Sequence, residues 1–339
     1  MQDCAPATDR YGYQIINNIR EAMIMKVRGF ALAVALVVPS FASAASFSTF
    51  YVFGDSLVDA GNIRIASGGA FPNASQGYFQ GRFTNGYDYT DLLSISAFGA
   101  PTVASLAGGN NFAFGGARVV TNADFSPDLA FQLAAYTRRV GGVGDPNALY
   151  VLTLGGNDVF ALGRGDTGTL SASEYATAVA TQYAGGVQYL NSIGARNILI
   201  TGIPNLTATG FALEAQLQAS LDALTLAPNT NLYRFSFLDF FTKVGTNPAS
   251  LGLPPQRTDT TCLLARTPGP GIDCTGIFSF DGIHPTAAIQ SAAAREINRQ
   301  FALVPAPVPE PMTWTYMIVG FAVTGAALRQ RRRNLLAAA

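Results

Sequence analysis

The sequence predicts an α/β protein in which a parallel sheet is covered by helices on both faces. Short apolar, β-rich runs alternate with longer stretches of helical periodicity through residues 46–304, and this alternation is typical of strand–helix–strand units. Hydrophobic residues make up 49% of the 339 residues, enough to bury a core against both faces. Since no internal repeat is evident, we expect one domain.

Five apolar runs are expected to form the sheet, because each is short and bounded by turn residues. Three of them run through a glycine to Ser56, Gly116 or Asn157. The predicted strands are residues 47–53, 111–114, 148–154, 197–201 and 232–238. The expected sheet therefore has about five strands.

Helical periodicity fills the intervals between these runs. Apolar side chains recur every three or four residues from Tyr175 to Leu190, and residues 208–224 and 285–301 also predict helices. Ligands of parallel sheets bind at the carboxyl ends of the strands. Side chains that follow the strands are therefore the candidates for a functional site.

The charge balance argues against one class of partner. Residues 46–304 carry 13 basic and 17 acidic side chains, a net charge of −4. They contain no basic stripe, so we expect no nucleic-acid partner.

Residues 1–45 predict an upstream extension followed by a secretory signal peptide. Lys26 and Arg28 precede an apolar run at 30–38, and small residues follow at 42–44. A basic, apolar and small-residue order is typical of such signals. The alternative is a membrane anchor, but the run is short for a span.

Residues 305–339 predict a Pro-rich linker followed by a second targeting segment. Pro-Glu-Pro at 309–311 precedes an apolar stretch at 312–328 and an arginine cluster at 329–333. The apolar stretch is near the lower limit for a membrane-spanning helix, and the arginines would keep the main domain outside the cytoplasm.

This order resembles the PEP-CTERM sorting signal of Gram-negative bacteria. The resemblance implies export through the inner membrane, processing by signal peptidase and an exosortase-type enzyme, and delivery to the cell surface or matrix. A plain C-terminal anchor is the alternative.

Two cysteines remain in the predicted domain, Cys262 and Cys274. In an oxidising compartment they could form a disulfide around a short loop, and two free thiols are the alternative. They lack CxxC spacing and the chain has one histidine, so we expect no metal site.

The chemically suggestive residues are Ser56, at the end of the first strand, and His284, the sole histidine. Serine needs a base to lose its proton, and histidine suits that role. Asp281 is close enough in sequence to orient the imidazole. A tight turn that opens a helix would also aim the Ser56 N–H and the helix dipole at an oxyanion. The alternatives are a capping serine and a surface histidine.

Four sequence blocks resemble those of the SGNH or GDSL hydrolases, and they occur in the order of that family. They are residues 53–62 with Gly-Asp-Ser-Leu, 111–117, 155–158 with Gly-Gly-Asn-Asp, and 281–286 with Asp-Gly-Ile-His-Pro-Thr. Residues 81–86 with Asp91, and 202–204, look like the lipase-type branch of the family.

The resemblance implies a three-layer α/β/α, flavodoxin-like fold and a serine esterase that needs no cofactor. Ser56 would be the nucleophile, His284 the base and Asp281 its partner. The oxyanion hole would comprise the N–H groups of Ser56 and Gly116 and the Asn157 amide. Gly115 is the alternative for the glycine role, and the structural alternative for Asn157 is a turn residue.

The resemblance leaves the ester open: a lipid, a short acyl ester and an acetylated polysaccharide all fit. The rival class is a non-catalytic surface or matrix protein that uses the same fold as a scaffold.

Some neighbouring residues favour structural roles. We expect Asp55 and Asp158 to make turn or cap hydrogen bonds and Arg82 to order its loop. An aromatic cluster precedes the second strand and could either line an acyl pocket or pack beneath a loop. Its members are Phe71, Tyr78, Phe79, Phe83, Tyr87 and Tyr89.

Overall fold

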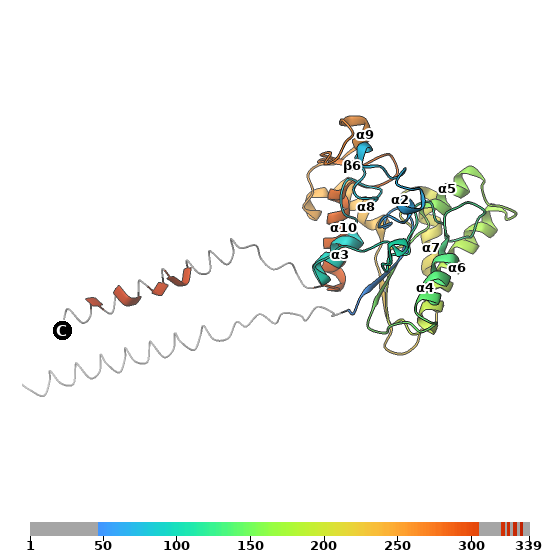
Figure 1. The fold of residues 1–339 in the computed structure, drawn as a ribbon, viewed down its shortest axis with the longest axis horizontal. Coiled ribbons are helices and arrows are strands. Elements are labelled where there is room, and N and C mark those ends of the chain that lie inside the picture. Colours follow the sequence, from blue (N-terminus) through green and yellow to red (C-terminus); the bar gives the residue numbers. More distant parts are fainter. Residues whose placement is uncertain (1–46, 305–319, 323, 326–327, 331–332, 335–339) are drawn as a thin grey trace, which may run out of the picture. The chain divides into compact units, whose positions relative to one another are not determined.

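The computed structural model describes residues 47–304 and a few residues between 320 and 334 (Figure 1). The described residues of the second group, 320–322, 324–325, 328–330 and 333–334, are helical. The predicted signal peptide, and most of the predicted sorting segment, lie outside the described residues. Within the described part of the chain, no helix combines the length and apolar character needed to cross a bilayer.

The core of the fold is a parallel sheet of four strands in the order β1-β2-β3-β4. Its strands are β1 (Phe50–Gly54), β2 (Leu149–Thr153), β3 (Asn197–Ile200) and β4 (Asn231–Arg234). Every residue of β2 is buried, as expected for a central strand with both faces covered. Gly54 pairs with Thr153 in register, so β1 and β2 end at the same edge of the sheet.

The expected fifth strand, residues 111–114, is not a strand, which corrects the predicted count. Asn111 makes one parallel bridge to Val52, and the N–H groups of Phe112 and Phe114 donate to β1. The pairing does not continue, because the Gly54 N–H donates to the Gln132 side-chain oxygen at 2.8 Å instead of to this segment. On its other side Asn111 makes a parallel bridge to Ala104, and the Asn62 amide donates to the carbonyls of Asn111 and Ala113. Counting this segment, the spatial order is the flavodoxin-like one.

Helices cover both faces, giving the three layers that the sequence predicts (Figure 1). One core cluster joins Tyr150 and Leu152 of β2 to the face that carries α4 (Leu129–Arg139), α6 (Ala172–Ser192) and α7 (Ala208–Asp222). The other joins Leu149 and Val151 to the opposite face. Its helices are α3 (Tyr89–Phe98), α8 (Phe237–Thr246) and α10 (Ala287–Phe301).

Shorter elements connect these layers. They are α2 (Asn62–Ala66), η1 (Ala74–Gln76), η2 (Ser105–Ala107), α5 (Gly156–Arg164), η3 (Pro248–Leu251), β5 (Arg257–Thr261), α9 (Cys262–Ala265) and β6 (Ile277–Ser279). Strands β5 and β6 form a separate parallel pair. The predicted strand 232–238 ends early: Ser236 caps α8 through a hydrogen bond to the Asp239 N–H, so its last residues begin a helix.

Candidate active site

Ser56 lies in a tight turn directly after β1. Gly54 makes this turn feasible, because a Cβ there would lie 2.4 Å from Val58 Cγ2 and 2.8 Å from the Thr153 carbonyl oxygen. The Asp55 carboxylate closes the turn by accepting from the Leu57 N–H at 3.0 Å. The expectation that Ser56 opens a helix is wrong, since α2 begins at Asn62. The Ser56 N–H therefore does not belong to the first turn of α2.

The structure brings Ser56, His284 and Asp281 together at the carboxyl end of β1. The His284 Nε2 atom lies 2.6 Å from Ser56 Oγ, and its Nδ1 atom lies 2.7 Å from Asp281 Oδ2. These contacts join segments 228 residues apart. A hydroxyl, an imidazole and a carboxylate in this order can pass a proton from the serine to the ring and stabilise the resulting imidazolium.

The backbone of residues 281–284 holds the histidine and its partner in place. Asp281 Oδ1 accepts from the N–H groups of Ile283, at 3.0 Å, and His284, at 2.9 Å. Burial would raise the pKa of Asp281, but the hydrogen bonds from the His284 ring and these N–H groups outweigh it and lower that pKa. The carboxyl is therefore an anion at neutral pH and accepts from His284 Nδ1.

The three predicted oxyanion donors each keep an unused hydrogen among the described residues. Among the described residues, neither the Ser56 N–H nor the Gly116 N–H has a hydrogen-bond partner. Asn157 donates one amide hydrogen to the Ala117 carbonyl at 2.9 Å, which leaves the other free. Gly116 has a φ of 88°, a conformation that glycine adopts without cost. All three groups are thus available to donate, and their role as an oxyanion hole stays a prediction.

Gly115, the alternative donor, is already engaged. Its N–H donates to the Asp59 carboxylate at 2.9 Å, and its carbonyl accepts from Ser126 Oγ at 2.7 Å. Asp59 also accepts from the N–H groups of Gly61 and Asn62. Gly115 therefore anchors the loop, and the free N–H belongs to Gly116.

Asp158 fastens the loop after Gly116 to the start of α5. Its carboxylate accepts from the Val119 N–H at 2.9 Å, the Val120 N–H at 3.2 Å and the Tyr175 hydroxyl at 3.0 Å. Asp158 therefore does more than the expected turn hydrogen bonding. It fixes the segment of Gly116 relative to that of Asn157.

Asp55, beside the candidate nucleophile, has an unusual titration. Its side chain is buried, and burial, with the nearby Asp158 carboxylate, raises the pKa of Asp55 to about 7. Its carboxylate accepts the turn hydrogen bond from the Leu57 N–H, in keeping with the expected structural role.

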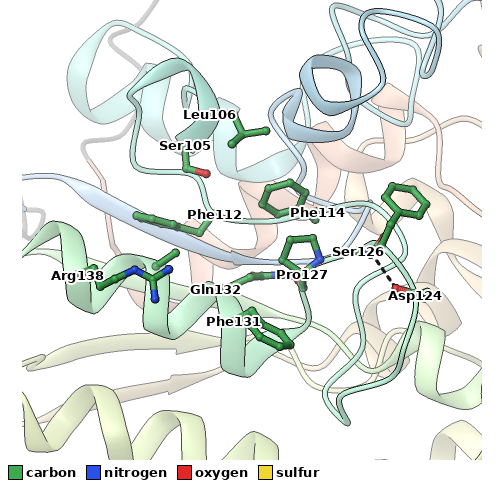
Figure 2. Close-up of a pocket in the computed structure, with 12 residues that line it drawn as sticks. Ser105, Leu106, Phe112, Phe114, Asp124, Ser126, Pro127, Phe131, Gln132 and Arg138 are labelled. Atoms are coloured by element: carbon green, nitrogen blue, oxygen red, sulfur yellow. Dashed lines mark hydrogen bonds between the residues drawn. The ribbon is translucent and has the colours of Figure 1, made fainter.

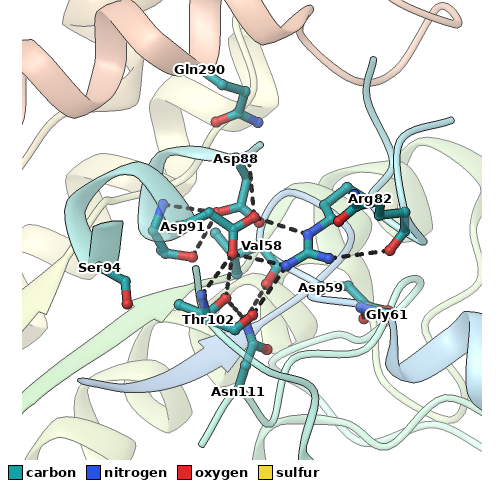
Figure 3. Close-up of polar contacts among 12 residues, drawn as sticks. Val58, Asp59, Gly61, Arg82, Asp88, Asp91, Ser94, Thr102, Asn111 and Gln290 are labelled. Carbon is teal, nitrogen blue, oxygen red and sulfur yellow. Dashed lines mark hydrogen bonds and ion pairs between the residues drawn. The ribbon is translucent and has the colours of Figure 1, made fainter. Parts of the chain in front are cut away.

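Arg82 orders the segment that precedes α3 (Figure 3). Its guanidinium donates to both oxygens of Asp91, at 2.9 and 3.0 Å, and to the Gln80 and Thr102 carbonyls. Arg82 and Asp91 are both buried, so this bidentate pair is a fixed anchor. Asp88 caps α3 beside it, but its Oδ2 atom is buried with no partner among the described residues.

The aromatic cluster packs around the candidate histidine and the loop that carries it. The Phe83 ring lies 5.2 Å from the His284 ring between centroids. Phe79 and Tyr87 pack edge to face at 4.9 Å, and Tyr89 lies in the core against Phe237. These contacts favour the packing alternative over an acyl pocket for the six aromatics.

Sequence reasoning missed a fourth member of the hydrogen-bonded set. The Tyr78 hydroxyl donates to Asp281 Oδ2 at 2.9 Å, across 203 residues of sequence. Tyr78 was singled out only as one aromatic of a cluster, and no motif at 74–80 indicates a contact with residue 281.

Cys262 and Cys274 form a disulfide in the structure. The loop that it closes packs on the segment between α2 and α3. A Cβ on Gly77 would lie 3.0 Å from Ile272, and Asn85 donates to the Ile272 carbonyl at 3.2 Å. Among the described residues, no cluster of His, Cys, Asp and Glu side chains could hold a metal ion.

A pocket of about 460 Å³ lies beside this site, between η2 and α4 (Figure 2). Its walls are mainly apolar and include Leu106, Phe114 and Phe131. None of the predicted catalytic side chains lines it. Ser126, which does line it, donates to Gly115, so the pocket shares a wall with the oxyanion loop.

The fold belongs to the class of α/β hydrolase-like proteins, because a parallel sheet lies between two helical layers and carries the candidate site at its carboxyl edge. Within that class the chain belongs to the GDSL-like lipase/acylhydrolase family, whose model matches residues 50–297. The description of this family names lipases and acylhydrolases.

One curated relative and several solved structures resemble the chain. Lipase 1 of Photorhabdus luminescens is 32% identical over 134 residues, which are 38% of this chain and 18% of that protein. The chain thus matches less than a fifth of that relative's length. A carbohydrate esterase structure has a TM-score of 0.42 at 14% identity, covering 74% of this chain and 67% of the other. For Axe2, an acetylxylan esterase from Geobacillus stearothermophilus, the TM-score is 0.39 at 14% identity, with coverages of 75% and 93%.

Proposed function

We propose that the chain hydrolyses carboxylic esters through an acyl-enzyme formed on Ser56. The observation that carries the proposal is the unbroken hydrogen-bonded series from Ser56 Oγ through His284 to Asp281, at 2.6 and 2.7 Å. Both distances lie within the range in which a base can take a proton directly.

In the first half of the reaction, His284 Nε2 takes the Ser56 proton while Oγ forms a bond to the ester carbonyl carbon. The carbonyl π electrons move to oxygen, and the Ser56 N–H, the Gly116 N–H and the Asn157 amide donate to this oxyanion. Asp281 stabilises the imidazolium. When the oxyanion collapses, the bond to the alcohol oxygen breaks, and the proton on Nε2 passes to the leaving alkoxide.

In the second half, water takes the place of the alcohol. His284 removes a proton from the water as it attacks the acyl carbon, and the same three donors hold the second oxyanion. Collapse expels Ser56 Oγ, which recovers its proton from His284, and releases the acid. Every proton taken is returned, so this cycle needs no metal or organic cofactor.

The test is hydrolysis of p-nitrophenyl esters of increasing chain length, measured for the wild type, for Ser56→Ala and for Ser96→Ala. Ser96 is a matched control, because its exposed hydroxyl bonds only to the Leu92 carbonyl on α3. We expect wild-type rates for Ser96→Ala and a loss of about 10⁴-fold or more for Ser56→Ala. Equal rates for all three proteins contradict the proposal and favour a non-catalytic scaffold.

The acyl-chain profile also sorts the three candidate esters. Preference for acetyl esters would favour an acetylated polysaccharide or another short acyl ester, and preference for long chains would favour a lipid. The proposed sorting to the cell surface favours the acetylated polysaccharide, because matrix polymers would surround the enzyme there.

We also propose that the domain acts outside the cytoplasm. Residues 1–45 would direct export through the inner membrane, and residues 305–339 would anchor the chain until an exosortase-type enzyme processes it at the cell surface. The disulfide fits this proposal, since disulfides persist in oxidising compartments. Mass spectrometry of the mature protein tests it: both ends intact in a cytoplasmic fraction would contradict it.

A further inference from the structure

Asp281 receives one hydrogen bond that ester hydrolysis by Ser56, His284 and Asp281 does not require. Its Oδ2 atom accepts from His284 Nδ1 at 2.7 Å and also from the Tyr78 hydroxyl at 2.9 Å. Its Oδ1 atom is occupied by two backbone N–H groups. Tyr78 and His284 therefore share a single carboxylate oxygen.

The Tyr78 ring is held so that its hydroxyl stays at this oxygen. The side chain is 7% exposed, and three aromatic rings surround it. The centroid distances are 5.0 Å to Phe280, 5.3 Å to Phe71 and 6.3 Å to Phe83. Such edge-to-face contacts fix the direction of the ring as well as its depth.

The segment that carries Tyr78 is anchored at both ends. On one side Gly77 lies against Ile272, within the disulfide-closed loop. On the other, Arg82 is fixed by its bidentate pair with Asp91 and by the Gln80 carbonyl (Figure 3). The hydroxyl is thus positioned by the fold before any substrate binds.

Tyr78 can only donate in this contact, because the carboxylate of Asp281 has no proton to give. Burial, and the negative charge of Asp281, raise the pKa of the Tyr78 hydroxyl, so it stays protonated through the neutral and mildly alkaline range. A donor on Oδ2 takes up part of the negative charge that otherwise stabilises the imidazolium. Removing that donor would make His284 a stronger base.

We propose that Tyr78 is a positioning residue that acts through Asp281: by sharing Oδ2 with His284, it lowers the pH at which the His284 ring loses its proton. The inference concerns the same site as the proposed ester hydrolysis and, for its consequence in catalysis, rests on that proposal. The coupling between the tyrosine and the histidine is a property of the folded protein and is measured without substrate.

The chain's single histidine makes the measurement unambiguous. With [¹³C]histidine labelling and any affinity tag removed, one ring signal reports the titration of His284. The variant is Tyr78→Phe, which removes only the hydroxyl and keeps the ring. The control is Tyr87→Phe, from the same segment, whose hydroxyl has no hydrogen-bond partner among the described residues.

We expect Tyr78→Phe to raise the pKa of His284 by about half a unit to one unit. The acidic limb of kcat/KM should move to higher pH by the same amount, with KM and the melting temperature nearly unchanged. Tyr87→Phe should leave the titration where it is. A purely structural tyrosine would alter stability without moving the titration.

A second pair of variants keeps the test decisive if Tyr78→Phe disturbs the fold. In an Asp281→Asn background, adding Tyr78→Phe should no longer move the His284 titration, because the shared carboxylate is absent. An unmoved or lowered pKa in Tyr78→Phe, or an equal shift in both backgrounds, overturns the inference. If the protein hydrolyses no ester but the titration moves as expected, the proposed function fails and the positioning role stands.

Discussion

Replacing Asn157 by alanine is expected to lower kcat by about 10² to 10³-fold, the range that loss of one oxyanion donor typically produces. Among the described residues this amide keeps one free hydrogen, and the Ser56 and Gly116 N–H groups have no partner. The variant therefore keeps two of three donors. In free energy this loss is about 3–4 kcal/mol of transition-state stabilisation.

The assay is steady-state hydrolysis of a p-nitrophenyl ester, with kcat and KM determined separately. The loss should fall on kcat, because the oxyanion exists only after the nucleophile attacks. Asn231→Ala is the control: this side chain, at the start of β4, donates to the Asn197 side chain at the start of β3, at the opposite end of the strands from the site. Asn157→Asp should lose at least as much activity as the alanine variant, since a carboxylate repels the oxyanion.

A kcat for Asn157→Ala within about threefold of the wild type would refute the assignment, because even a weak donor contributes more than that. A selective rise in KM would also refute it, since it would place Asn157 in ground-state binding. Melting temperatures for both variants exclude unfolding as the cause, because Asn157 also joins α5 to the Ala117 carbonyl.

Three further predictions follow from the same geometry. His284→Ala should nearly abolish ester hydrolysis, while Asp281→Asn should reduce kcat less completely, by about 10²–10⁴-fold. Asp88→Asn should stabilise the protein at pH 8 in urea unfolding, by about 1 kcal/mol or more, and have little effect near pH 4. Replacing Cys262 and Cys274 by serine should lower the free energy of unfolding by about 3 kcal/mol, because the unfolded chain regains the entropy that closing a loop of this length removes.

The sign of the Asp88 effect follows from its burial and from the nearby Asp91 charge, which raise the pKa of Asp88 to about 8. A carboxyl whose pKa is higher in the folded state stabilises the fold at low pH, and this contribution is lost as the pH rises toward that value. Asparagine keeps the capping oxygen for α3 and never ionises. A variant less stable than the wild type at pH 8 would contradict this reasoning.

The other two predictions have equally direct contrary outcomes. Wild-type turnover in His284→Ala would contradict the assignment of His284 as the general base. For the cysteines, the wild type is kept oxidised throughout. An unchanged urea midpoint in the serine variant would then show that the disulfide does not stabilise the fold.

The sequence predicted the layered fold and the meeting of distant motifs because both depend on local patterns. Alternating strand and helix periods imply a parallel sheet, and Ser56, Gly116 and Asn157 each directly follow a strand or strand-like segment. Since such segments end at a common edge, their neighbours in sequence become neighbours in space.

What the sequence did not show depends on long-range packing and side-chain competition. The expected fifth strand makes only an isolated bridge to β1, because the Gln132 side chain accepts the Gly54 N–H. The predicted strand 232–238 was cut short by the Ser236 cap of α8. Tyr78 meets Asp281 across 203 residues, and an aromatic residue in a loop carries no signal of such a contact.

The central claim is that Ser56 is a nucleophile activated by His284, and active-site labelling tests it most directly. The untagged protein is treated with a fluorophosphonate, and the labelled peptide is identified by mass spectrometry. The account predicts a single adduct on Ser56, formed much more slowly in His284→Ala and absent in Ser56→Ala. An unlabelled Ser56 in a folded protein, or equal labelling of the wild type and His284→Ala, would contradict it.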